Sequence, residues 1–169
     1  GAVVDVDAIV ESGYYLTGWS GGTINDSSTK PTNQIVMNKP KDITALLRLR
    51  QTLVVGGSGQ YSYPGDAIDD AQDGDIILVA PGEYTSASQF PASQVLISLL
   101  GKKITISGYN PDDEAVVRAT ILRDYGFALQ DLDSESVIAG ITLEQGRMEL
   151  TNADLIIRNC VFVDCRFRR

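Results

Sequence analysis

Carboxylates are the main groups with which this chain could do chemistry, because its 169 residues include 22 Asp and Glu and no histidine. Without histidine, the chain lacks the commonest general base and metal ligand. Three consecutive acids follow an Asn-Pro turn, and grouped carboxylates are oxygen donors of the kind that Ca²⁺ prefers. The candidate Ca²⁺ ligands are Asp112, Asp113 and Glu114. The stretch has neither the EF-hand nor the nonapeptide Ca²⁺ spacing, and a solvated acidic turn is the alternative.

Two further acids, Asp131 and Asp133, lie two residues apart and form a candidate carboxylate pair of the kind that cleaves glycosidic bonds. If both residues lie on one strand, their side chains share a face. The two carboxylates are then too close in sequence to act as acid and base from opposite sides of a substrate. A polar turn between strands is the alternative. The remaining charged candidates are Lys102, Lys103 and Asp124. These residues do not provide a recognisable combination of general base, general acid and substrate-binding group. We therefore favour a chain without its own catalysis and leave the enzyme alternative open.

Aromatic residues near the N-terminus could bind sugar rings by stacking. Tyr15 and Trp19 are the candidate carbohydrate-binding residues. The alternative is that Trp19 anchors the core of a small domain, since small domains depend on each large apolar side chain that they bury.

Cys160 and Cys165 lie five residues apart, which matches neither a CxxC redox pair nor a zinc-binding pair. Two cysteines alone cannot make a four-ligand zinc site, so we expect both to pack as small apolar side chains and leave their redox state open. A Gly-rich stretch, Gly56 to Gly59, lacks the Gly-Lys-Ser/Thr of a phosphate-binding loop. Residues 52–64 are therefore expected to be a connector.

Charge is uneven along the chain, whose net charge is −8. Residues 51–135 carry thirteen acids against four bases, whereas the segments on either side are close to neutral. An acidic middle argues against nucleic acid or an anionic membrane as partner. No apolar run reaches the length of about 18 residues that a transmembrane helix needs, so we expect no membrane insertion.

Among the segments that could position these candidate residues, residues 65–84 have the clearest secondary-structure pattern. Ala67, Ile68 and Ala71 recur at helical spacing, and a buried strand is expected over 76–79 between an Asp-Gly turn and a Pro-Gly turn. The stretch GDAIDDAQDGDIILVAPGEY resembles the opening of right-handed parallel β-helices of the pectate-lyase-like superfamily, in which A-I-x-x-A-x-x-G-D-x-I-x-V-x-P-G-x-Y begins the solenoid. The resemblance implies a fold, because many unrelated activities share this scaffold.

An internal repeat at the C-terminal end supports a solenoid. When residues 138–150 are compared with residues 157–169, an offset of nineteen, apolar residues align with apolar residues and turn residues with turn residues. The apolar pairs are Ile138 with Ile157, Ile141 with Cys160, Leu143 with Phe162, and Met148 with Phe167. We expect these side chains to form inward ladders in which each coil packs on the next. A leucine-rich repeat is set aside, because its signature is not met.

Residues before Arg50 have a different pattern of short strands separated by Gly, Asn, Ser and Pro, which indicates a small all-β unit. The segment resembles the divergent InlB-type bacterial repeat, with Leu16 and Leu47 where an aromatic residue is usual. The matching positions are Ala8, Gly13, Tyr14, Gly18-Trp19-Ser20-Gly21, Met37, Lys41 and Ile43-Thr44-Ala45.

The sequence thus predicts an all-β chain: a small β-sheet module over residues 1–51, then a right-handed parallel β-helix over 52–169 with a short N-terminal capping helix. The resemblances imply part of an extracellular or cell-surface bacterial protein, structural or adhesive, in a filament or surface layer. One alternative is the N-terminal part of a polysaccharide lyase or glycoside hydrolase with its active coils beyond Arg169. The other is a carbohydrate-binding module.

Both ends of the chain look cut, and the last coil is expected to leave unpaired strand edges. Further chain or another protein subunit is the expected partner at that end. Two alternatives stay open: a fragment of a longer protein, and a complete subunit that polymerises end to end.

Overall fold

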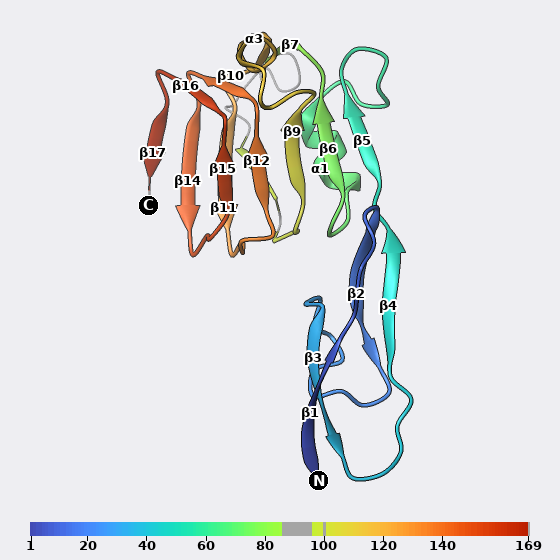
Figure 1. Ribbon diagram of the computed structural model, residues 1–169. Coiled ribbons are helices and arrows are strands. Elements are labelled where there is room, and N and C mark those ends of the chain that lie inside the picture. Colours follow the sequence, from blue (N-terminus) through green and yellow to red (C-terminus); the bar gives the residue numbers. More distant parts are fainter. Residues whose placement is uncertain (86–95, 100, 169) are drawn as a thin grey trace. The chain divides into compact units, whose positions relative to one another are not determined.

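The structure is a computed structural model that describes residues 1–85, 96–99 and 101–168 (Figure 1). It is all-β, with about 47% of residues in strands and 8% in helices. The chain divides into two compact units, Gly1–Arg50 and Gln51–Arg169. Each unit has its own sheets and is described separately.

The first unit consists of two antiparallel strand pairs. Strand β1 (Ala2–Asp7) pairs with β3 (Thr32–Met37), and β2 (Tyr14–Ser20) pairs with β4 (Thr44–Leu49). These short strands agree with the small all-β unit expected before Arg50. The buried apolar side chains of this unit are Tyr15, Leu16, Trp19 and Ile35.

The second unit contains three parallel sheets. The first sheet consists of β5 (Thr52–Val55), β6 (Ile76–Val79), β9 (Thr105–Gly108), β12 (Val137–Ala139) and β15 (Ile156–Arg158). The second sheet consists of β7 (Gly82–Thr85), β10 (Thr120–Arg123), β13 (Thr142–Glu144) and β16 (Val161–Val163). The third sheet consists of β8 (Leu96–Ser98), β11 (Gly126–Gln130), β14 (Arg147–Thr151) and β17 (Arg166–Arg168).

From β6 to β17 the chain visits these sheets in rotation, contributing one strand to the first, second and third sheet before returning to the first. We call three such consecutive strands a coil. All strand pairs in the three sheets are parallel. This arrangement is compatible with a parallel β-helix, and Figure 1 shows the strands of successive coils side by side.

The nineteen-residue register predicted from the sequence is confirmed in the last two coils. Ile138 lies opposite Ile157, Leu143 opposite Phe162, and Met148 opposite Phe167, one pair in each sheet. Their side chains belong to, or pack against, one apolar core that runs through the unit, except for the two phenylalanines, which are partly exposed. Burial of these ladders supplies the main driving force for stacking.

The strand β6 lies at the predicted residues, although only Ile77 and Val79 are fully buried. The expected helix is α1 (Pro64–Asp70), which packs against β5 and β6 through Ala67 and Ile68. The expectation that residues 52–64 form only a connector is wrong, because β5 occupies its first four positions and pairs with β6. Gly56 to Gly59 form a turn after this strand. Their glycine content favoured the connector interpretation and obscured the strand before them.

Another helix, α3 (Glu114–Ala119), was not expected from the sequence. It begins where the acidic turn was predicted, because the Asp113 carboxylate caps it by accepting hydrogen bonds from the backbone N–H groups of Ala115 and Val116. With six residues, the helix is too short to show a periodic apolar pattern.

Corners between strands are built from residues in the left-handed region. They are Asp124, Asp131, Gln145, Asn152, Asn159 and Asp164, each with φ between 48° and 59°. Where another coil follows, the corner N–H can donate to a carbonyl of that coil, as Asp124 does to Glu144, Asp131 to Thr151, and Gln145 to Val163. Asn and Asp tolerate this conformation better than most residues, so they mark the corners in the sequence.

Candidate functional site

The proposed Ca²⁺ ligands each have a protein partner in the structure. Asp113 caps α3, and the Glu114 carboxylate pairs with Arg118 at 2.8 Å. Asp112 Oδ1 accepts a hydrogen bond of 2.7 Å from the side-chain amide of Asn159, which joins the α3 segment to the last coil. The three carboxylates therefore serve three separate structural contacts, two within the α3 segment and one with the last coil.

Within the described residues, no group of three or more Asp, Glu, His or Cys is arranged to hold a metal ion. Calcium binding at Asp112, Asp113 and Glu114 stays a prediction. Calcium titration of thermal unfolding tests it: stabilisation that Asp112→Asn abolishes would support a site at this turn.

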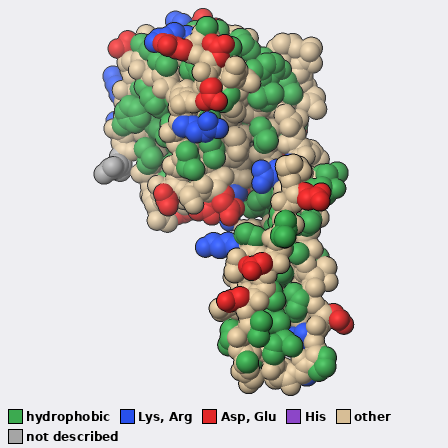
Figure 2. Space-filling model, viewed as in Figure 1, with side chains coloured by type: hydrophobic (Ala, Val, Ile, Leu, Met, Phe, Trp, Pro, Cys, Tyr) green, Lys and Arg blue, Asp and Glu red, His purple; other side chains and the backbone are tan. Residues whose placement is uncertain are grey.

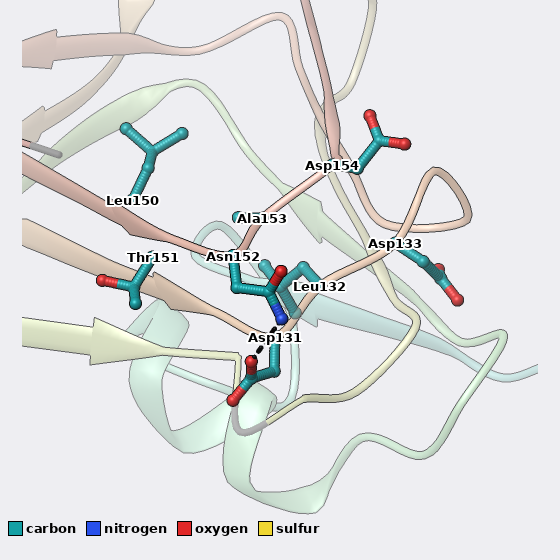
Figure 3. Close-up of a pocket in the computed structure, with 8 residues that line it drawn as sticks. All are labelled: Asp131, Leu132, Asp133, Leu150, Thr151, Asn152, Ala153 and Asp154. Carbon is teal, nitrogen blue, oxygen red and sulfur yellow. Dashed lines mark hydrogen bonds between the residues drawn. The ribbon is translucent and has the colours of Figure 1, made fainter.

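An open groove of about 800 Å³ lies at the corner that follows the third sheet (Figure 3). Its lining comes from two neighbouring coils, which contribute Asp131, Leu132, Asp133, Leu150, Thr151, Asn152, Ala153 and Asp154. Three carboxylates in one open groove could bind the hydroxyls of a sugar or a cation. The corner residues cross-link its wall, because the Asn152 amide donates to Asp131 Oδ1 at 2.8 Å.

The candidate glycosidase pair is not set up as facing carboxylates. Figure 3 shows the Asp131 and Asp133 side chains pointing in different directions. Asp133 lies 3.1 Å from Lys103 Nζ and also accepts a hydrogen bond from the Glu135 backbone N–H. Both aspartates thus stabilise the turn between coils, in line with the alternative explanation from the sequence.

The other lysine candidate also has a structural contact. Lys102 Nζ donates to the backbone carbonyls of Ile68 and Asp69, at 2.7 and 2.9 Å. These carbonyls belong to the last turn of α1, where a cation is favourable. Sequence reasoning missed the most buried carboxylate, Asp75, which is 2% exposed and accepts from the backbone N–H groups of Gln51 and Gln72.

The aromatic candidates lie inside the first unit. Tyr15 is 7% and Trp19 is 5% exposed, and the Trp19 indole N–H donates to the Lys30 carbonyl at 3.2 Å. Arg48 and Arg50 lie over the Tyr15 ring, 5.8 and 5.9 Å from its centroid. Their burial favours the packing explanation, and sugar binding by these rings stays a prediction.

Both cysteines are free thiols and partly buried at corners of the last coil. Burial raises the pKa of the Cys160 thiol, against an opposing effect of nearby backbone hydrogen bonds and Arg158. A raised pKa disfavours the nucleophilic thiolate, so Cys160 fits a packing role better than a reactive one.

Arginines gather in a second depression, of about 330 Å³, beside the last two coils. Arg147, Arg166 and Arg168 line it together with the carboxylates of Asp124 and Asp164. Sequence reasoning did not identify this cluster, although Arg147 and Arg166 are related by the same nineteen-residue offset as the apolar pairs. On the face shown in Figure 2, acidic and basic side chains are likewise interspersed.

Comparison with known proteins gives one match. Residues 1–47 match the family model of the divergent InlB B-repeat domain, which confirms the resemblance of the N-terminal segment. This family is bacterial and typically linked to the cell surface. No curated protein and no solved structure matches the chain. Among the described helices, none is long and apolar enough to cross a membrane.

Proposed function

We propose that the chain is part of a bacterial cell-surface protein in which residues 51–169 form a right-handed parallel β-helix that serves as a scaffold without catalysis of its own. The observation that carries this proposal is that the candidate catalytic and ligand-binding residues make structural contacts within the fold. Asp113 and Lys102 cap or hold helix ends, Asp131 and Asp133 brace corners, and Asp75 fixes the start of β5.

The rotation of strands through three parallel sheets supports the solenoid. The family match supports a surface location, since that family is typically surface-linked. A solenoid presents long, regular faces whose size grows by adding coils, which suits a structural or adhesive role in a filament or surface layer.

An enzyme is the second candidate, favoured by the three carboxylates in the corner groove. We place a polysaccharide lyase or glycoside hydrolase second, because Asp131 and Asp133 point apart and Asp133 is paired with Lys103. A carbohydrate-binding module is third, because both candidate rings are buried.

A polysaccharide screen separates the three candidates. The chain is incubated with acidic and neutral polysaccharides, and both reducing ends or unsaturated products and retained ligand are measured. The scaffold proposal expects neither turnover nor saturable binding. Turnover that Asp131→Asn or Asp154→Asn abolishes would establish the enzyme, and saturable binding without turnover would establish the binding module.

A further inference from the structure

The outer surface of the third sheet carries a pair of arginines in register. Met148 is 1% exposed and belongs to the core, so the alternation along β14 points Arg147 outward. The pairing of β14 with β17 places Arg166 directly opposite Arg147, and Arg168 follows on the same face. These side chains point across the stacking direction, so the surface that they form does not depend on the open ends of the stack.

The second sheet neutralises its outward arginine, whereas the third sheet does not. Arg123 lies between Glu83 at 3.0 Å and Glu144 at 2.8 Å, one carboxylate from each neighbouring strand. On β11, the residue opposite Arg147 is Gly126, which supplies no carboxylate. Like charges directly opposite each other destabilise a sheet, so the arginine pair of the third sheet favours a bound counter-ion.

Hydrogen-bonding groups of these arginines are left for such an ion. Glu149 Oε1 lies 3.2 Å from Arg147 Nε, but this buried Nε forms no hydrogen bond. Neither Arg166 nor Arg168 forms an ion pair with another described residue. The chain has 22 acidic and 14 basic residues, so a shortage of carboxylates does not explain the unpaired arginines.

Hydroxyl-binding groups line the same depression of about 330 Å³. Asp124, Gln145 and Asp164 occupy equivalent corners of three successive coils, two residues before the strand positions of the arginine pair. In the described part of the chain, neither Asp124 nor Asp164 forms an ion pair. Carboxylates accept hydrogen bonds, and the glutamine amide both donates and accepts them, so this row suits the hydroxyls of a ligand whose anionic group lies at the arginines.

A phosphate group fits the arginine pair better than a carboxylate does. Neighbouring parallel strands lie about 4.8 Å apart, which sets two guanidinium groups side by side. A tetrahedral phosphate presents oxygens in several directions and can accept from both groups, whereas the two coplanar oxygens of a carboxylate match one guanidinium fork. Arginine–phosphate pairs are also among the strong, charge-assisted hydrogen bonds.

We propose that this depression is a binding site for a phosphate ester of a polyol. The phosphate lies between Arg147 and Arg166, and the hydroxyls of the polyol bind Asp124 and Asp164. The site adds a ligand to the proposed scaffold and does not depend on its cellular location.

The test is a calorimetric titration of the full chain with glycerol 3-phosphate. Arg147→Gln and Arg166→Gln should each weaken binding by about tenfold, because each removes charge-assisted hydrogen bonds to the phosphate. The matched control is Arg158→Gln, which removes the same charge from an exposed position of β15 in the first sheet and should leave the affinity unchanged. Thermal unfolding of each variant confirms that it is folded.

The polyol contact has its own readout. Wild-type chain should bind glycerol 3-phosphate more tightly than inorganic phosphate, and glycerol or glucuronate only weakly. Asp164→Asn should strengthen the binding of inorganic phosphate, because it removes a repelling charge, and should reduce the advantage of glycerol 3-phosphate over it. A uniform effect of this variant on both ligands would contradict the assigned role of the corner row.

Vesicles distinguish the two sources of such an ester. Retention of the chain by phosphatidylglycerol vesicles, lost in Arg166→Gln, would support the site with a lipid headgroup as ligand. Binding of glycerol 3-phosphate without retention would support it with a free or polymeric ester. No saturable binding of either, equal losses in Arg166→Gln and Arg158→Gln, or equal affinity for glucuronate would overturn the proposal. These outcomes are separate from polysaccharide turnover, which tests the scaffold function itself.

Discussion

At the scale of single residues, the buried Tyr84 side chain is held in place by a hydrogen bond and by close contact with a glycine. The Tyr84 hydroxyl donates to the Ala80 carbonyl at 2.8 Å inside the core. Gly56, at φ +76°, lies directly against that hydroxyl, and an added Cβ would fall 1.8 Å from it. At the neighbouring Gly57, φ +57°, an added Cβ would make only an ordinary van der Waals contact, with the Ala80 Cβ at 3.7 Å.

This pair of glycines predicts unequal effects of the same substitution. Gly57→Ala should cost about 1 kcal/mol of unfolding free energy, the strain of a left-handed alanine. Gly56→Ala should cost roughly 2–4 kcal/mol, because steric overlap with Tyr84 adds to that strain. Denaturant unfolding measures both. Equal losses would mean that Tyr84 does not occupy this position.

A second residue-scale prediction concerns alkaline pH. Burial, with smaller effects of Tyr63 and Asp66, raises the pKa of Tyr125 from 10.0 to about 12. The folded state thus favours the neutral phenol, so this stabilisation is complete below about pH 10 and is lost as pH rises through 12. The loss should approach about 2 kcal/mol. Tyr125→Phe should flatten this part of the stability profile, and an unchanged profile would contradict the assignment.

At the scale of elements, one ladder runs from the core to the open edge. Leu122 and Leu143 are at most 1% exposed, whereas Phe162 in the next coil is 37% exposed. The sequence predicts this ladder through its nineteen-residue offset, but it does not reveal the exposure, which depends on what lies beyond the last coil. Cys160 was likewise expected to be buried and is only partly so.

The ladder predicts graded costs of truncation. Leu143→Ala should lower the unfolding free energy by about 2–5 kcal/mol, because it leaves a cavity in the core. Phe162→Ala should cost only about 1–2 kcal/mol, because less apolar area is lost from a half-open site. Urea unfolding with both variants checks this order. A greater cost for Phe162→Ala would place the last coil inside a covered core.

The two elements that were not predicted from the sequence, β5 and α3, were missed for the same reason. The strand β5 precedes four residues rich in glycine, and α3 is shorter than two helical turns. Pairing with β6 and capping by Asp113 stabilise these segments, and neither contact has a local periodic signal. The candidate site shows the same limit: the acids were visible in sequence, but the partners that engage them, such as Asn159 for Asp112, lie far along the chain.

At the scale of the whole molecule, the chain holds two compact units with separate cores. We expect Gln51–Arg169 to fold without the first unit, because the Asp75 carboxylate that fixes Gln51 belongs to the second unit. The isolated segment should keep the hydrogen-exchange protection that β6, β9 and β12 have in the full chain. Loss of this protection would show that the units depend on each other.

The proposed surface location rests on the family match of residues 1–47. The most direct measurement is labelling of intact cells of the encoding bacterium with an antibody against residues 51–169, before and after permeabilisation. The proposal predicts labelling of intact cells, with little increase on permeabilisation. Labelling that appears only after permeabilisation would contradict it.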